Sequence, residues 1–127
     1  MPLLGLRHLA LRVRDPQVSK GFYCDCLGMS VVWEPDADNV YLSSGVDNLA
    51  LHRAEAAGPG ALDHMGFIVA SKEEVDAWAE RLRARGVNMA AEPRDHRDGS
   101  RSLYCFDPDG LRIQVLYEPT LSRQRIE

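Results

Sequence analysis

Residues 63–87, DHMGFIVASKEEVDAWAERLRARGV, contain a complete strand-to-helix unit. The first part, residues 63–69, is rich in apolar residues and predicts a strand. Ser71 and Glu74 then have the spacing of a capping box, which marks a helix start. The helix that follows presents an apolar stripe and ends at Gly86. The stripe is made by Val75, Trp78 and Leu82.

Three further strands are predicted downstream of this helix. They lie at about residues 87–90, 102–106 and 112–117. The last two are separated by Asp-Pro-Asp-Gly at residues 107–110, which is a tight-turn sequence. The second half of the chain therefore predicts one βαβββ module.

The first half repeats this order of elements. Residues 6–14, LRHLALRVR, alternate in polarity and predict a strand. Asp15 and Pro16 then suit a helix start, because they supply a capping side chain and a proline in the first turn. The helix has an apolar stripe and ends at Gly28. The remaining predictions are the stripe Phe22, Tyr23 and Leu27, and strands at residues 29–33, 40–43 and 48–52.

The two halves correspond position by position. His8 and His64 lie 56 positions apart, and Gly28 and Gly86 lie 58 apart. A repeat of this length indicates two modules in one domain of residues 1–127. The modules would span about residues 5–54 and 62–119, with residues 54–61 as a linker. The alternative is one irregular α+β domain whose halves agree by chance.

Composition limits the possible functions. The 127 residues are 45% hydrophobic, with a formal net charge of −4. This balance argues against a general nucleic-acid surface, which needs a basic stripe, and no apolar run is long enough to span a membrane. The three cysteines cannot all pair internally, so reduced thiols in a cytoplasmic protein are expected.

Several short motifs resemble those of one superfamily. The chain is similar to the vicinal oxygen chelate superfamily, which includes glyoxalase I, bleomycin-resistance proteins, fosfomycin-resistance thiol transferases and extradiol dioxygenases. This resemblance covers about residues 5–119. It implies an α+β fold in which two βαβββ modules form a cup-shaped mixed sheet, and it implies a homodimer. The motifs are HLAL at 8–11, FY at 22–23, LGM at 27–29, HMGF at 64–67, SLY at 102–104 and DPDG at 107–110.

The resemblance also implies a divalent metal site (Zn, Mn, Fe or Ni) inside the cup. By motif, the ligands would be His8, His64 and Gln114. A fourth ligand position aligns with Ala50, which cannot bind a metal. His52 lies two residues further on and would face the same side of its strand.

Gln114 is a departure from the family pattern, because the enzymes usually have Glu at this position. A neutral amide binds a cation more weakly than a carboxylate and cannot act as a general base. Proton transfer next to a carbonyl and extradiol cleavage both use a carboxylate. Glu118, four residues later, could replace it only if the strand end bends inward.

The remaining site predictions concern substrate contact and catalysis. Ser102 and Tyr104 share a strand face and would offer hydroxyl groups to a substrate. Arg97 or Arg101 would hold an anion, and His52 would line the cup. The predicted catalytic residues are Gln114, Tyr104 and Glu118, and the predicted substrate-binding residues are His52, Ser102, Tyr104 and Arg101.

Two functions remain open. The first is a metal-dependent lyase or dioxygenase that acts on a small substrate with vicinal oxygens, using the metal as a Lewis acid. The second is a metal-free protein that binds a small molecule, as the drug-sequestering members of the family do. The two histidines favour the first function, and the missing glutamate favours the second.

Overall fold

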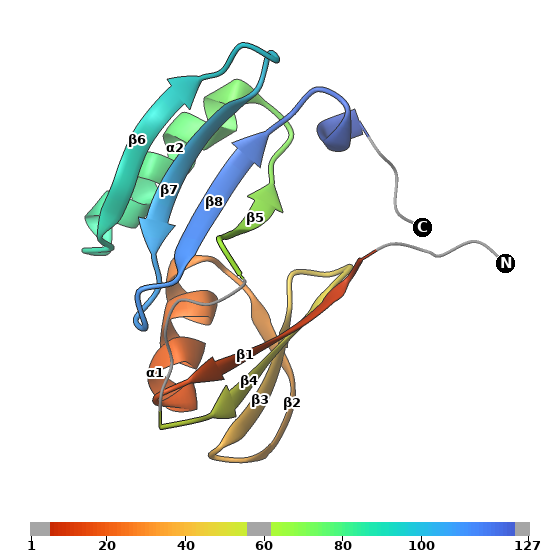
Figure 1. Cartoon of the computed structure of the whole chain (residues 1–127), viewed down its shortest axis with the longest axis vertical. Helices are drawn as coiled ribbons and strands as arrows, with labels where there is room; N and C mark the ends of the chain where they lie inside the picture. Colours follow the sequence, from red (N-terminus) through yellow and green to blue (C-terminus); the bar gives the residue numbers. More distant parts are fainter. Residues whose placement is uncertain (1–5, 56–61, 124–127) are drawn as a thin grey trace, which may run out of the picture. The chain divides into compact units, whose positions relative to one another are not determined.

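The computed structural model describes residues 6–55 and 62–123. The chain divides into two compact units, residues 1–57 and 58–127. Each unit holds one βαβββ module (Figure 1). The predicted linker at residues 54–61 lies for the most part outside the described residues.

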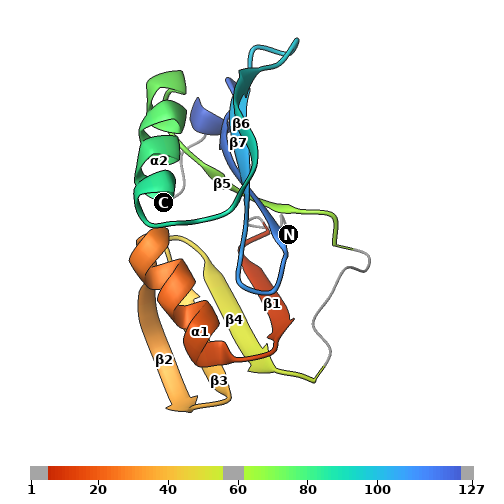
Figure 2. The same cartoon turned by 90° about the vertical axis from the view of Figure 1, so that its left-hand side faces the viewer.

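The first module is a four-stranded mixed sheet with one helical segment. Its strand order is β1-β4-β3-β2, with β1 and β4 parallel and the other pairs antiparallel. Helix α1 packs on β3 and β4, on one side of the sheet (Figure 2). The elements are β1 (His8–Val13), α1 (Pro16–Gly21), η1 (Phe22–Cys26), β2 (Ser30–Asp36), β3 (Asn39–Ser43) and β4 (Asn48–Arg53).

The second module has the same topology. Its strand order is β5-β8-β7-β6, again with the first pair parallel. Helix α2 packs on β6, β7 and β8. The elements are β5 (Met65–Ile68), α2 (Lys72–Ala84), β6 (Met89–Asp95), β7 (Arg101–Phe106), β8 (Arg112–Tyr117) and the short helix η2 (Leu121–Arg123). The predicted α+β class with two βαβββ modules is therefore confirmed.

Each sheet has one face against its helix and one face turned away from it. Strand side chains alternate between these faces, and in β1, β3, β4, β7 and β8 apolar residues on the helix side are buried. They form a separate apolar core in each module. The strand residues of these cores are Leu11, Val13, Val40, Leu42, Leu49 and Leu51 in the first module, and Leu103, Cys105, Ile113 and Val115 in the second. We call the opposite side of each sheet its open face.

Both predicted helix starts are present. The Asp15 carboxylate accepts a hydrogen bond from the Gln17 amide at 3.0 Å. The Ser71 hydroxyl accepts one from the Glu74 amide at 3.2 Å. The Glu74 carboxylate accepts in turn from the Ala70 amide at 2.6 Å, one residue before the position that a strict capping box uses.

The first helix differs from its prediction in one respect. It changes at Phe22 from an α-helix to a π-helix, so that the Leu27 amide donates to the Phe22 carbonyl. Phe22 and Tyr23 are both buried, with ring centroids 5.0 Å apart in an edge-to-face contact. The wider turn accommodates two consecutive buried aromatic rings, which a regular helical stripe does not require.

Strand β2 is longer than predicted. The sequence predicted its end at Trp33, whereas β2 continues to Asp36 and β3 begins at Asn39. Pro35 is tolerated because β2 is an edge strand, and the pairing with β3 shifts register on both sides of Trp33. Every residue of β2 is exposed, including the consecutive apolar residues Val31 and Val32.

Two composition-based expectations can be compared with the structure. Among residues 6–55 and 62–123, no helix has the length and apolarity needed to cross a membrane. Within the part of the chain that the structure describes, Cys24, Cys26 and Cys105 form no disulfide.

Candidate functional site

Strands β5, β7 and β8 bring three of the predicted site residues together on the open face of the second module. Gln114 on β8 is paired with both Tyr104 on β7 and Gly66 on β5. Paired residues of neighbouring strands point to the same face. His64 precedes Gly66 by two residues, so strand alternation places it on this face as well.

Tyr104 is at the centre of this group. Its ring lies edge-to-face against the His64 ring, with centroids 5.4 Å apart. Its hydroxyl accepts a hydrogen bond from the Gln114 Nε2 at 3.0 Å. The Arg112 guanidinium lies 5.7 Å from the ring centroid, within the range of a cation–π contact. We call His64, Tyr104 and Gln114 the polar cluster of the second module.

The amide of Gln114 has a defined orientation in the polar cluster. Its Nε2 donates to Tyr104, so its Oε1 is the free acceptor. Oε1 lies against β5, since a Cβ atom at Gly66 would be 3.4 Å from it. Gly66 therefore leaves room for the amide oxygen on the strand that follows His64.

His64 is oriented by the residue before it. Its Nδ1 lies 2.7 Å from the Asp63 carboxylate. A carboxylate is an acceptor only, so Nδ1 is the protonated nitrogen and Nε2 has the lone pair in the neutral ring. The hydrogen bond also holds the pKa of Asp63 below its ordinary value.

His8 in the first module has a comparable partner. Its Nδ1 lies 2.9 Å from the Asn48 Oδ1, on the paired position of β4. With that oxygen as acceptor, Nε2 is again the free nitrogen. In metal-binding histidines, the ring nitrogen that does not bind the metal commonly donates a hydrogen bond to an oxygen acceptor.

His52 lies on the same open face as His8 but not beside it. His8 pairs with Asn48, four residues before His52 on β4, which corresponds to roughly 13 Å along a strand. The His52 Nδ1 lies 2.7 Å from the Asn39 Oδ1, and the Asn39 Nδ2 donates to Asp36 at 2.9 Å. His52 is therefore not a partner of His8 within the first module, and its predicted substrate contact stays a prediction.

Strand register identifies the counterpart of Gln114 in the first module. Gln114 pairs with Gly66, two residues after His64, and Ala50 pairs with Ala10, two residues after His8. Ala50 thus occupies the equivalent position, as the family alignment predicted. Its methyl group cannot bind a cation, and its side chain is completely buried.

Ser102 lies on the open face with Tyr104, and its hydroxyl is hydrogen-bonded to a neighbouring side chain. Its hydroxyl lies 2.8 Å from the His96 Nε2, and it is 2% exposed. In this arrangement the hydroxyl is bonded within the protein. The predicted contact of Ser102 with a substrate stays a prediction that would require His96 to move.

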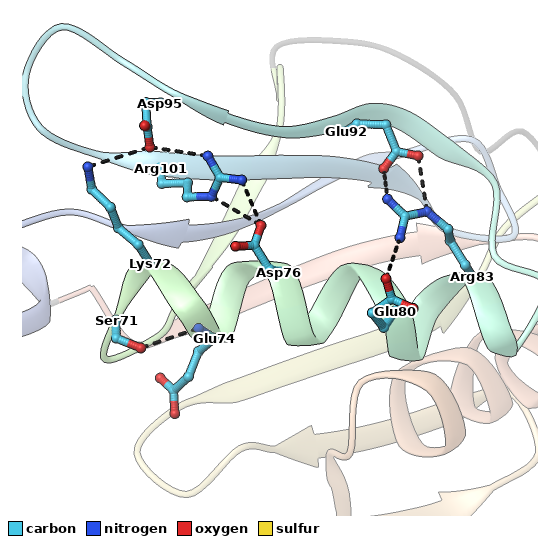
Figure 3. A network of polar contacts seen from close by, with 9 residues as sticks. All are labelled: Ser71, Lys72, Glu74, Asp76, Glu80, Arg83, Glu92, Asp95 and Arg101. Atoms are coloured by element: carbon cyan, nitrogen blue, oxygen red, sulfur yellow. Dashed lines mark hydrogen bonds and ion pairs between the residues drawn. The ribbon is translucent and has the colours of Figure 1, made fainter.

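Arg101 lies on the helix side of its sheet. Its guanidinium bonds to Asp76 on α2 at 2.7 and 3.1 Å and to Asp95 on β6 at 3.2 Å (Figure 3). Asp95 also contacts Lys72 at 3.5 Å. Two carboxylates already compensate this cation, so it serves to hold α2 against the sheet. Anion binding by Arg101 stays a prediction without support from these contacts.

Glu118 is engaged at the end of β8. Its Oε2 accepts hydrogen bonds from the Thr120 amide at 3.0 Å and the Leu121 amide at 2.8 Å, and also from the Thr120 hydroxyl. These bonds hold the pKa of Glu118 below its ordinary value, with the Thr120 side chain as the main cause. The carboxylate caps η2, and the structure does not bring it together with Gln114.

A metal needs more ligands than either module supplies by itself. The second module offers His64 and the neutral oxygen of Gln114, and the first offers His8 and His52, which lie too far apart along the sheet to share an ion, with no donor at Ala50. Within residues 6–55 and 62–123, no three His, Cys, Asp or Glu side chains form a metal-binding group. The donor set of a single module therefore does not fit a divalent transition metal. The roles predicted for His8, His64 and Gln114 as ligands stay predictions.

Several residues around the histidines were not singled out from the sequence. Asp63 had a usable signal, because it directly precedes His64. Asn48, Asn39 and Tyr41 had none, because only the strand register brings them beside the histidines.

Comparison with protein families gives one match over most of the chain. Residues 5–115 match the family "Glyoxalase/Bleomycin resistance protein/Dioxygenase superfamily". The matched range includes the polar cluster of the second module and most of both sheets.

Individual proteins with similar sequences or structures are named for different reactions. A probable lactoylglutathione lyase from Synechocystis is 25% identical over 87% of this chain and 93% of its own. The metallothiol transferase FosB from Staphylococcus epidermidis is 27% identical over 91% of this chain and 82% of its own. The crystal structure of a lactoylglutathione lyase from Agrobacterium tumefaciens, 26% identical, superposes with a TM-score of 0.78 over 92% of this chain and 96% of its own.

Proposed function

Because this chain belongs to the glyoxalase, bleomycin resistance protein and dioxygenase superfamily, we propose that it binds a small oxygenated molecule on the open face of its second module. The observation that supports this proposal best is the polar cluster. His64, Tyr104 and Gln114 lie together there, with defined hydrogen-bond roles.

The polar cluster offers both donors and acceptors to a ligand. The Tyr104 hydroxyl accepts from Gln114, so its own proton is free to be donated. The Nε2 of neutral His64 and the Oε1 of Gln114 are free acceptors. A molecule with a hydroxyl group next to a second oxygen matches this pattern, because one oxygen donates and its neighbour accepts.

The cluster lacks a carboxylate that could move a proton. Gln114 is neutral, and Glu118 is bonded to Thr120 and Leu121. Abstraction of a proton next to a carbonyl needs a general base within hydrogen-bond reach. We therefore propose recognition without a carboxylate-mediated proton transfer.

The proposal can be tested by titrating the protein with catechol and following backbone amide signals by NMR. Catechol has two adjacent oxygens, whereas resorcinol has the same groups further apart. We expect catechol to bind more tightly and to shift amides of β5, β7 and β8. Tyr104→Phe should weaken catechol binding by about fivefold to tenfold, because one hydrogen bond is lost.

Tyr41→Phe, which removes a tyrosine hydroxyl from the first module, is the matched control and should leave catechol affinity unchanged. Equal binding of catechol and resorcinol, or equal losses in the two variants, would contradict recognition by the polar cluster.

A metal-dependent enzyme is the second candidate function. It is favoured by one observation, the oxygen acceptors that orient His64 and His8 through Nδ1. Bound metal would supply a Lewis acid for a ligand oxygen. In that case His64→Ala should abolish uptake of Zn²⁺, Mn²⁺ and Fe²⁺, and Gln114→Glu should increase it by restoring a charged oxygen. Equal metal uptake by the wild type and both variants, or no uptake by any of them, would exclude this candidate.

We also propose that the chain forms a homodimer, which the resemblance to small family members implied. Sedimentation velocity at micromolar concentration should give the mass of two chains. A single species at the mass of one chain would contradict this assignment.

A further inference from the structure

A hydrogen bond between His96 and Ser102 covers part of the open face of the second module, beside the polar cluster. The His96 Nε2 lies 2.8 Å from the Ser102 hydroxyl, and Ser102 is 2% exposed. Ser102 lies two residues from Tyr104 on β7, so their side chains share a face with a backbone separation of roughly 7 Å. The imidazole of His96 therefore covers the next polar group on β7 after the polar cluster.

The His96 side chain can leave Ser102 without a change in the backbone. His96 directly follows β6, and its amide donates to the Ser100 carbonyl at 2.8 Å, which closes the hairpin. The Gly99 amide donates to the His96 carbonyl at 3.1 Å, and the Ser100 amide donates to the Asp98 carboxylate at 2.9 Å. These three bonds do not involve the imidazole ring. Rotation of the His96 side chain would thus release Ser102 while the loop keeps its shape.

Release of Ser102 requires a replacement for its bond to His96. A buried hydroxyl without a partner is destabilising, because it has lost its hydrogen bonds to water. Every buried side-chain nitrogen and oxygen among the described residues has a partner, and that of the Ser102 hydroxyl is His96. A ligand that displaces His96 must therefore supply a hydrogen-bonding group of its own. An apolar group at this place would leave the hydroxyl unpaired and would bind more weakly.

We propose that His96 is a specificity-determining residue, whose side chain is exchanged for a polar group of the ligand at Ser102. This inference rests on the proposed function, because it takes the adjacent oxygens of the ligand to be bound by the polar cluster. It adds a third polar group, on the opposite side of the ligand from the paired oxygens. A serine hydroxyl can donate and accept, so a hydroxyl group on the ligand matches it.

The experiment compares three ligands by NMR titration of the full chain. Catechol has the paired oxygens alone, 3,4-dihydroxybenzyl alcohol adds a hydroxyl group across the ring, and 4-ethylcatechol adds an apolar group of the same length. We expect the wild type to bind the benzyl alcohol more tightly than 4-ethylcatechol. Signals of the His96 ring should shift with the benzyl alcohol but not with catechol, because only the former displaces the imidazole.

Removal of the imidazole should favour the benzyl alcohol selectively. His96→Ala should strengthen its binding by about fivefold, because the bond to Ser102 no longer has to be broken. The affinities for catechol and 4-ethylcatechol should change by less than about twofold, since neither bonds to Ser102. Adding Ser102→Ala to His96→Ala should cancel the gain, because both substitutions act through one contact. His96→Gln, which keeps a group able to bond to Ser102, should give an intermediate affinity.

Asp98→Asn is the matched control, because it changes a side chain of the same loop but keeps an oxygen for the Ser100 amide. It should leave all three affinities unchanged. The proposal is overturned if His96→Ala changes the affinities for catechol and the benzyl alcohol by the same factor, if the gain persists without the Ser102 hydroxyl, or if the His96 ring signals do not respond to the benzyl alcohol. In these cases catechol still binds and the proposed function stands. Absence of catechol binding in both the wild type and His96→Ala would overturn the proposed function, and the role of His96 with it.

Discussion

The first and second modules have the same strand order and the same parallel pair, yet their open faces differ in chemistry. In the second module the position two residues after the histidine pairs with Gln114, which is bonded to a tyrosine. In the first module the equivalent position pairs with a buried alanine, and aromatic rings occupy the neighbouring strands. One face therefore suits hydrogen-bonded recognition and the other suits stacking.

This difference shows that a shared topology fixes where a side chain lies but not what it does. The helix faces of both modules are alike, because each must bury apolar residues against one helix. The open faces have no such requirement and can diverge.

The largest effect is expected from placing a carboxylate at the two counterpart positions. Ala50→Glu should lower the free energy of unfolding by about 3–5 kcal/mol, because Ala50 is completely buried and the new charge would be uncompensated. Gln114→Glu should change it by less than about 1 kcal/mol, because Glu has a similar shape and can accept from Tyr104. Urea denaturation measures both values. Equal losses would mean that the two positions have the same environment.

Core substitutions should affect the two modules alike. Leu42→Ala in the first module and Leu82→Ala in the second remove completely buried side chains. Each should lower the free energy of unfolding by about 2–5 kcal/mol, through lost burial and the cavity that remains. Calorimetry and urea denaturation would detect these losses. A tolerated substitution in one module would show that its core is not required for cooperative folding.

Removal of the helix caps should have a smaller effect. Ser71→Ala should lower the free energy of unfolding by about 1 kcal/mol, because the Glu74 amide loses its partner. Asp15→Ala should cost about as much or slightly more, since Asp15 also contacts Arg53 at 3.6 Å. Ser71→Thr is a control that keeps a capping hydroxyl. A larger loss for Ser71→Ala than for Asp15→Ala would reverse the expected order.

The smallest effect concerns the acid stability that the second module gains from the ion pairs of Figure 3. Hydrogen bonding from Arg101 holds the pKa of Asp95 below its ordinary value in the folded chain. A carboxyl group whose pKa is lower in the folded chain stabilises the fold at pH values above its pKa in the unfolded chain, which is about 4. This stabilisation is lost as the pH falls through the lower pKa of the folded chain. Arg101→Gln should therefore lower the melting temperature at pH 7 more than at pH 3. An equal loss at both pH values would contradict this linkage.

Much of the fold was predictable because its signals are local. Asp15, Ser71 and the glycines at 28 and 86 mark helix ends through contacts within a few residues. The π-helix at Phe22 was not predictable from apolar spacing, because a π-turn and an α-turn bury similar stripes. The end of β2 was misplaced because Pro35 usually interrupts strands, and only its edge position makes it acceptable.

The site was less predictable, because its contacts join distant parts of the sequence. The sequence predicted Tyr104 and Gln114 as site residues, but the hydrogen bond between them depends on the register of β7 and β8. The sequence predicted that Arg101 binds an anion. It did not reveal the partner Asp76, because Asp76 lies 25 residues earlier, on a helix. Glu118 was predicted as a possible base, although the nearby Thr120 offered a signal for capping.

The exposed strand β2 has a consequence for the behaviour of the protein at high concentration. An unpaired edge with apolar residues is a template on which strands of other molecules can add. Here Val31, Val32 and Trp33 form such a segment, and Glu34, Pro35 and Asp36 follow directly. The proline removes a donor, and the Asp36 carboxylate would repel a like-charged strand, so both oppose the addition of another strand. Glu34 is paired with Lys20 at 3.0 Å, so acidification would weaken this protection mainly by protonating Asp36.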